Sequence, residues 1–329
     1  MKRSIFLLAA CAAILFSCKS NLAGTTAPDL PEAVTFGTYV PYTRTAALTS
    51  ANIANFGVYA YYNPSGGWNA DLTPNFMFDQ KVEGSAAAGF SYSPLKYWPK
   101  NEGETISFFA YAPYKSASNG ISEQSQPSAA GSPLIRYSLP ASEANQVDLL
   151  CASPCPSKTA FGGEVYFTFS HALSRIGVRA QTPASVLSGG SRVYLNSVSI
   201  EAGFPSSGIL DLGDCSWSNV QAGESTTYTR SLGDGESGLS VGSSASAVFS
   251  GDNYVMCIPA DDLTLRLAVT YTVVTTDASL AAGKSVIVNT VRLSTHLEAL
   301  SGKTHTILLN ISPDAVTFGL PDESDWDDA

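Results

Sequence analysis

The chain has few charges: Lys, Arg, Asp and Glu are 14% of its 329 residues, against roughly 25% in an average soluble domain. Basic residues are the scarcer sign, 18 against 28 acidic ones, for a net charge of −10. This balance argues against sequence-independent binding to nucleic acid, which needs basic side chains against phosphates. Only 3 His and 3 Met are present, a poor supply of metal ligands. Instead, 44% hydrophobic residues, 27 Gly and 18 Pro favour an ordered all-β chain, long enough for two domains.

The N-terminus reads as an export signal. Lys2 and Arg3 precede an apolar run, Ile5 to Phe16, that is shorter than the roughly 20 residues of a membrane-spanning helix. The run ends in Leu-Phe-Ser-Cys18, which resembles a bacterial lipobox. We therefore expect residues 1–17 to be a lipoprotein signal peptide, Cys18 to carry fatty acyl chains such as palmitate, and residues 18–29 to be a tether. The alternative is an ordinary secretory signal with a chance cysteine.

Four further cysteines remain for an oxidising compartment: Cys151, Cys155, Cys215 and Cys257. They allow two disulfides, and their pairing cannot be read from the sequence. The Cys151/Cys155 spacing is more typical of a loop staple or free thiols than of a redox or metal pair. Cys257 suits a buried thiol as well as a disulfide.

Period-two alternation of apolar and polar residues predicts strand after strand and no long amphipathic helix. The clearest strands are Ile106–Tyr111, Val165–Phe169, Arg175–Arg179, Val193–Ile200, Leu263–Thr275, Ser285–Leu293 and His305–Ile311. A helical turn is expected at Thr295–Leu300, before Gly302. A Pro/Ser/Gly-rich stretch suggests domains at residues 30–160 and 161–329, and the Ser/Gly-rich stretch Gly203–Gly251 is expected to hold surface loops. Core positions are expected for a group of aromatic residues: Tyr97, Trp98, Phe108, Phe109 and Tyr111.

Two patterns that resemble catalytic or metal sites lack their context. Gly238–Gly242 matches the nucleophile-elbow pattern around Ser240, but a Gly/Ser-rich loop surrounds it where a strand and a helix are needed. His171, His296 and His305 lack the spacing of a metalloprotease motif. We expect His171 to be satisfied by a nearby backbone carbonyl. The sequence thus predicts no enzyme, no cofactor and no metal site.

Several motifs, taken in order, resemble the fimbrillin family of Bacteroidales-type fimbriae in its Mfa-like branch. They are Phe56–Tyr61, Tyr92–Pro99, Ile106–Tyr114, Gln146–Leu150, Phe167–Ile176, Tyr254–Pro259 and Ser301–Ile307. The resemblance implies two transthyretin-like β-sandwich domains in tandem. It also implies a lipoprotein pilin or pilus-associated subunit of the bacterial outer membrane and cell surface, with other fimbrial subunits as partners.

The two ends of the mature chain carry the same short sequence. Residues 33–37 read Ala-Val-Thr-Phe-Gly, and so do residues 315–319, which aligns Val34 and Phe36 with Val316 and Phe318. One interpretation is coincidence between generic β sequences. The other is that both segments can occupy one groove, the first in the precursor and a neighbour's residues 314–329 in the polymer, by donor-strand exchange. The family resemblance implies this route.

Exchange requires the first strand to leave. The resemblance implies that a trypsin-like maturation protease cuts between Arg44 and Thr45, although Arg44 could also be a plain surface residue. We therefore expect a fimbrial structural subunit that contributes to adhesion to a host or bacterial surface ligand. The alternative is a surface lipoprotein that binds glycan or protein without polymerising, which an exposed aromatic platform at Tyr61 and Trp68 would favour.

Overall fold

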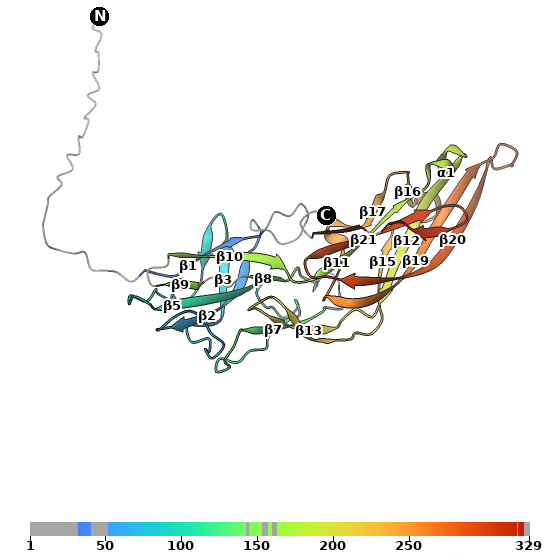
Figure 1. The fold of residues 1–329 in the computed structure, drawn as a ribbon. Coiled ribbons are helices and arrows are strands. Elements are labelled where there is room, and N and C mark those ends of the chain that lie inside the picture. The colour runs from blue at the N-terminus through green and yellow to red at the C-terminus, as the bar shows by residue number, and fades with distance from the viewer. Residues whose placement is uncertain are drawn as a thin grey trace, which may run out of the picture. The chain divides into compact units, whose positions relative to one another are not determined.

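The computed structural model describes residues 32–40, 52–142, 145–152, 157–159, 163–320 and 322–325. Within them, regular structure is almost entirely β-strand, arranged in four sheets (Figure 1). The helical elements in this part are α1 (Ala184–Ser188) and the 3-10 turns η2 (Gly235–Ser237) and η3 (Gly251–Asn253). No helix among the described residues is long and apolar enough to span a membrane. The expected all-β fold is confirmed.

The first sheet has eight strands and wraps around an aromatic core. Its order is β1 (Thr35–Tyr39), β10 (Glu164–His171), β8 (Leu150–Ala152), β5 (Thr105–Ala112), β2 (Asn55–Asn63), β3 (Met77–Ser85) and β4 (Gly89–Ser91), with β9 (Ser157–Thr159) also paired to β5. β1 runs parallel to β10, whereas the other pairs are antiparallel. Phe56, Phe108 and Phe167 meet in the core that the sheet encloses.

A four-stranded sheet covers the other face of the central strands. Its order is β14 (Trp217–Gln221), β13 (Ser207–Asp211), β7 (Leu134–Ser138) and β6 (Ile121–Glu123). β2 is therefore buried on both faces: Phe56 and Val58 lie in one core, and Tyr59 and Tyr61 in the other. This double burial explains why β2 and β5 read as continuous apolar runs, since a strand with one wet face alternates.

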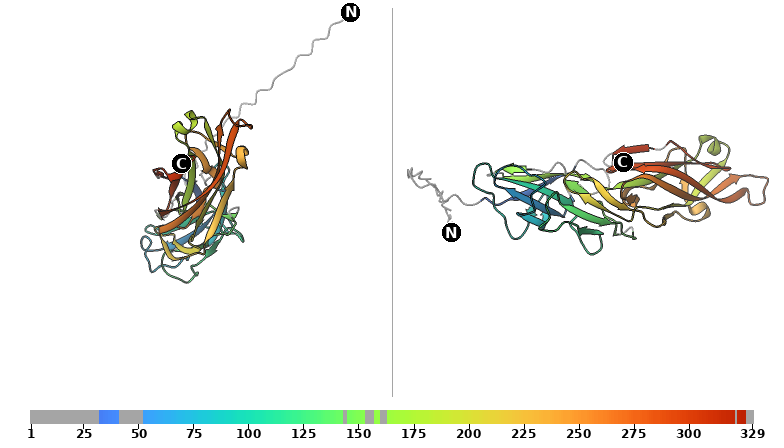
Figure 2. Two further views of the ribbon diagram at one scale, coloured as in Figure 1. Left: turned by 90° about the vertical axis from the view of Figure 1, so that its right-hand side faces the viewer. Right: turned by 60° about the horizontal axis from the view of Figure 1, so that its bottom comes forward.

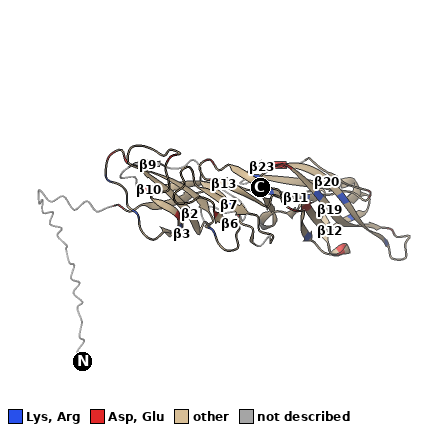
Figure 3. Ribbon diagram, turned by 90° about the horizontal axis from the view of Figure 1, so that it is seen from below, with Lys and Arg blue, Asp and Glu red and all other residues tan. Residues whose placement is uncertain are grey.

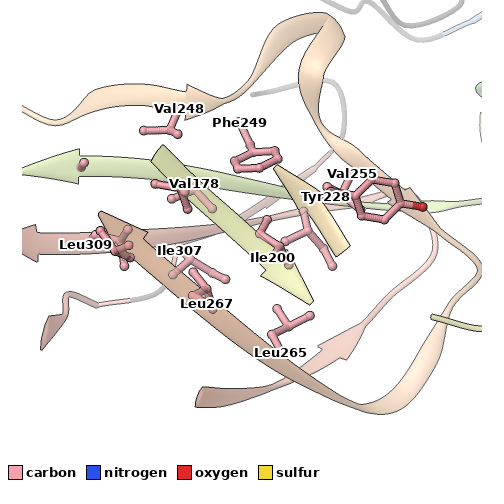
Figure 4. Packing of buried hydrophobic residues seen from close by; sticks show 14 of the residues in the cluster. Val178, Ile200, Tyr228, Val248, Phe249, Val255, Leu265, Leu267, Ile307 and Leu309 are labelled. Atoms are coloured by element: carbon pink, nitrogen blue, oxygen red, sulfur yellow. The ribbon is translucent and has the colours of Figure 1, made fainter. Parts of the chain in front are cut away.

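Two further sheets enclose the third core. One is β17 (Ser246–Phe249), β11 (Ser174–Gln181), β21 (Lys303–Ile311) and β22 (Val316–Phe318), with β18 (Val255–Cys257) on β11 and β23 (Asp322–Asp325) on β21. The other is β15 (Thr226–Ser231), β12 (Ser191–Ala202), β19 (Ala260–Thr276) and β20 (Lys284–Ala299), with β16 (Leu239–Val241) on β12. Side chains such as Val178, Ile200 and Leu309 interdigitate between them (Figure 4). β19 and β20 form a long hairpin whose strands run side by side (Figure 2).

Strand pairing does not follow the division expected between residues 160 and 161. β10, expected in the second domain, pairs with β1 and β8 of the first sheet because its buried Val165, Phe167 and Phe169 complete the first core. In the other direction, β13 pairs with β7. One strand of each sequence half is therefore paired across the expected boundary: β10 lies in the sheet of the first half, and β13 pairs with β7.

Three local expectations were wrong. Gly203–Gly251 holds β13 to β17 rather than only loops, because Ser- and Thr-rich segments with few buried residues still complete ladders beside longer strands. Thr295–Leu300 does not form a helical turn: Thr295–Ala299 is the end of β20, and Leu297 pairs with Leu263 of β19. Tyr97 is 46% exposed, whereas the other four aromatic residues of its group are buried as expected.

Candidate functional site

β1 pairs with β10 on one side, and the residues just before β1 are bonded on the other side. Its residues pair with β10 from Thr35–Glu164 to Tyr39–Thr168. On the other side, the Val34 N–H donates to the Lys96 carbonyl at 2.9 Å, and the Trp98 N–H donates to the Glu32 carbonyl at 2.9 Å. β1 therefore closes the gap between β10 and the segment that follows β4.

Phe36 is the main anchor of β1. Its side chain is 3% exposed and its ring centroid lies 5.3 Å from Tyr92, 5.7 Å from Phe167, 6.0 Å from Phe108 and 6.2 Å from Phe56. Val34 is 1% exposed in the same core. Removing β1 would leave an apolar trough lined by aromatic rings, with unpaired backbone groups along it.

The second copy of the repeated sequence lies on a different sheet. β22 pairs antiparallel with β21, Phe318 opposite Leu309 and Val316 opposite Ile311. Val316 is buried and Phe318 is half-buried against the third core. A hollow of about 100 Å³ lies beside Phe318, lined also by Leu297 and Ile307. In the single chain, the two copies thus occupy separate sheets rather than one groove.

β23 continues the tail along the same edge of β21. Lys303 pairs with Asp325 at 2.6 Å, and His305 Nδ1 lies 3.7 Å from a Glu323 carboxylate oxygen. Burial lowers the pKa of His305, although the nearby Glu323 opposes the shift. The tail is held by a short ladder, by one exposed ion pair between Lys303 and Asp325, which is a weak contact in water, and by the longer contact of Glu323 with the buried His305.

Both copies place their glycine under a neighbouring side chain. A Cβ at Gly37 would run into the ring of Tyr166, the residue opposite it on β10. A Cβ at Gly319 would meet Leu308 Cδ2 at 2.6 Å. The shared pattern of Val, Phe and Gly therefore has the same structural use at both ends: two anchors and a covered glycine.

The cysteine pairing is now defined where the structure describes it. Cys151 of β8 bonds to Cys215, in the turn between β13 and β14, with a sulfur–sulfur distance of 2.02 Å. Neither a staple to Cys155 nor a free thiol, the two alternatives expected for Cys151, is therefore correct. Cys257 is a free thiol whose burial raises its pKa to about 12. Cys155 lies outside the described residues, as do Cys18, Arg44 and Thr45.

Two ionisable side chains of the interior, His171 and Tyr111, have carboxylate partners. His171 Nδ1 lies 2.9 Å from Asp148 Oδ1, so its partners include a carboxylate, which the sequence did not indicate. Tyr111 donates to Asp79 at 2.8 Å, and burial followed by the charge of Asp79 raises the pKa of Tyr111. This phenol remains a protonated donor that stabilises a buried carboxylate.

The two patterns that resembled catalytic or metal sites have no such geometry here. Ser240 lies exposed on β16, which is followed by β17 instead of a helix. No cluster of His, Cys, Asp and Glu that could hold a metal occurs among the described residues.

One surface feature was not found from the sequence. A hollow of about 420 Å³ lies over β12, β15, β19 and β20, and its lining includes Glu201, Arg266 and Arg292. A sequence signal did exist, because Arg266 and Arg292 occupy outward positions of long alternating strands in a chain with few basic residues.

Comparison with known proteins identifies the family to which the chain belongs. The Fimbrillin-like family model matches residues 43–326. Fimbrium subunit Fim1C of Phocaeicola vulgatus is 25% identical over 325 residues, which cover 87% of this chain and 85% of that protein. A crystal structure of a fimbrial protein from Bacteroides vulgatus matches with a TM-score of 0.69 at 21% identity, covering 89% of this chain and 99% of that one. A candidate cell adhesion protein from Bacteroides ovatus matches with a TM-score of 0.56 at 12% identity, covering 90% and 98%. Since the family model spans most of its length, the chain belongs to the fimbrillin-like family.

Proposed function

We propose that the chain is a structural subunit of cell-surface fimbriae that polymerises by protease-triggered donor-strand exchange and contributes to adhesion. The observation that carries the proposal is the position of the first repeat on the first sheet, which we call its seat: the trough between β10 and the segment after β4. Phe36 and Val34 fill an aromatic trough that no other described segment fills. A sheet that loses such a strand exposes apolar surface and an open edge, and both favour the entry of another strand.

The tail has the features needed to take that seat in a neighbouring subunit. Residues 315–319 repeat residues 33–37, so Val316 and Phe318 would supply the two anchors. β22 contains only three residues, and Phe318 is half-buried, whereas Phe36 is almost fully buried. Phe318 therefore has less contact to lose on its own sheet than it would gain in the trough, and the tail must also detach β23 from β21. Val316 is buried in its own core, so its release is the larger cost.

Export and maturation complete the proposal. Lipid on Cys18 would hold the precursor at the outer membrane. A cut between Arg44 and Thr45 would separate β1 from the rest of the chain, since β1 ends at Tyr39. Partners in this scheme are other fimbrial subunits and a trypsin-like maturation protease.

The experiment follows the N-terminus of the assembled material. Polymers should begin at Thr45, and Arg44→Ala should accumulate as membrane-bound precursor with unchanged folding by circular dichroism. Polymers that retain residues 33–42 would overturn strand exchange at this seat. The matched control is Arg192→Ala, an exposed arginine on β12, which should polymerise normally.

The alternative is a surface lipoprotein that binds glycan or protein without polymerising, and an exposed aromatic platform at Tyr61 and Trp68 would have favoured it. Tyr61 is 1% exposed, and Trp68 packs edge-to-face on Phe109 at 5.5 Å. The two do not form an exposed aromatic platform.

A further inference from the structure

The hollow over β12, β15, β19 and β20 is a second candidate site. It lies on a sheet that contains neither strand of the proposed exchange. We propose that it binds an acidic sugar unit of a glycan through the sugar carboxylate. Seven outward side chains form its lining, from four adjacent strands: Thr227, Ser199, Glu201, Arg266, Ala268, Arg292 and Ser294. Figure 3 shows where basic residues occur along β19 and β20, and two of them, Arg266 and Arg292, line the hollow.

Strand register explains why the surface is concave there. Ser199 lies opposite Ala268, and Ala268 lies opposite Arg292, so one row across the sheet has two small side chains beside a long one. The next row places Glu201, Arg266 and Ser294 in line. Because cross-strand neighbours lie about 5 Å apart, Ala268 forms a floor between the two arginines. The alternate residues Ile200 and Leu267 are buried, which fixes the backbone beneath.

The hollow carries a local positive charge in an acidic chain. Arg266 and Glu201 form one ion pair at 3.4 Å, with side chains 63% and 41% exposed, so solvent screens it. Arg292 has no acidic partner among the described residues. Two guanidinium groups thus face one carboxylate, which leaves one positive charge available for a ligand.

The lining selects the chemical class of that ligand. A guanidinium group matches a carboxylate with two parallel hydrogen bonds. The hydroxyls of Ser199, Thr227 and Ser294 both donate and accept, as sugar hydroxyls do. No aromatic ring lines the hollow, so it lacks the apolar platform on which a neutral sugar would stack, and charge must supply the recognition. A volume of about 420 Å³ suits one or two sugar units.

The site is compatible with the proposed polymer, on which this inference rests only for its place at the cell surface. The sheet that carries the hollow contains neither β1 nor β22. Strand exchange at those two elements would therefore not change the pairing of the strands that carry the hollow. Acidic sugars reach such a surface either as hexuronates within polysaccharides or as sialic acids at glycan ends, and both present the same carboxylate.

The test measures sugar binding by saturation-transfer NMR and calorimetry on the full mature chain. The probes are a galacturonate trisaccharide, 3′-sialyllactose, neutral lactose and inorganic phosphate. We expect at least one acidic sugar to bind at least tenfold more tightly than lactose and phosphate, and the affinities of the two acidic probes identify the source. Arg292→Gln and Arg266→Gln should each weaken binding at least tenfold.

Arg192→Gln is the matched control, because Arg192 is exposed on β12 at the level of Val274 of β19, eight residues along the ladder from Arg266. It should bind the sugar normally. The inference is overturned if neither acidic sugar binds, if lactose or phosphate binds equally well, or if Arg192→Gln loses as much affinity as Arg292→Gln. Polymer content, measured on the same variants, should stay normal. Wild-type protein that binds the sugar but does not polymerise would count against the proposed function alone.

Discussion

Replacing Phe36 or Phe318 by Ala should weaken different states of the protein. In the precursor, Phe36 is 3% exposed among four aromatic rings. Truncation of such a residue leaves a cavity and costs about 3–5 kcal/mol. Phe318 is only half-buried on its own sheet, so its truncation should cost the precursor about 1–2 kcal/mol.

In the polymer, Phe318→Ala should cost more stability than Phe36→Ala, the reverse of the precursor. After cleavage at Arg44 the segment with Phe36 is absent, so Phe36→Ala should not change polymer stability. Phe318 would then occupy the aromatic seat, and Phe318→Ala should cost the junction about 3–5 kcal/mol. Phe76→Ala is the control, because Phe76 is a partly buried phenylalanine of the same core outside both strands and should weaken both states similarly.

Two measurements separate these states. The urea midpoint of the uncleaved precursor, followed by circular dichroism, gives its free energy of unfolding. The temperature at which polymers dissociate in detergent ranks the junctions. Equal losses for Phe36→Ala and Phe318→Ala in the precursor, or polymers of Phe318→Ala as heat-resistant as wild type, would refute the shared seat.

Three further changes test other parts of the molecule. Cys18→Ala should leave the protein out of the membrane fraction, and unchanged detergent partitioning would contradict lipidation. Cys151→Ser should cost roughly 4 kcal/mol in urea unfolding, because the disulfide with Cys215 spans 64 residues; reduced wild type should match it. Burial lowers the pKa of His305 below 6.5, so the unfolded chain binds the proton first and the free energy of unfolding should fall as pH drops below 6.5. His305→Gln should flatten the curve of urea midpoint between pH 7.5 and 5.5, and an unaltered slope would argue against it.

The sequence predicted strands best where alternation and burial agree. β10 alternates strictly because one of its faces contacts the first core, and β21 buries Ile307 and Leu309 while Leu308 stays partly exposed. β13 was missed because Gly208 and its Ser-rich surroundings look like a loop. Its burial comes from pairing with β7, about 70 residues earlier, and no local pattern encodes that partner.

The candidate sites likewise contain some features that local sequence indicates and others that depend on long-range pairing. The repeated sequence at the two ends could be read directly, whereas the seats of its two copies could not, since Phe36 faces rings contributed by β2, β5 and β10. The partner of Cys151 was equally hidden, because Cys215 reaches it through the β7–β13 pairing. The two arginines of the hollow were visible as residues, but their proximity depends on the register of β19 and β20.

The glycine of the repeat gives the most selective test of the shared seat. Gly37 lies beneath the ring of Tyr166, a side chain that is otherwise 61% exposed, and a ring over an edge glycine is a recurrent way to fix strand register. If the tail takes this seat in the same register, Gly319 would lie beneath Tyr166 of the neighbouring subunit. A valine at 319 would then have to displace a ring, whereas on its own sheet its Cβ meets two flexible side chains that can shift, Leu308 (2.6 Å from Cδ2) and Asn310 (3.1 Å from Nδ2). Gly319→Val should therefore leave the urea midpoint of the precursor nearly unchanged and slow polymerisation strongly, and Gly319→Val with Tyr166→Ala should restore it. Normal polymerisation of the single variant would mean that Leu308, rather than a neighbour's Tyr166, is the side chain for which residue 319 must be small.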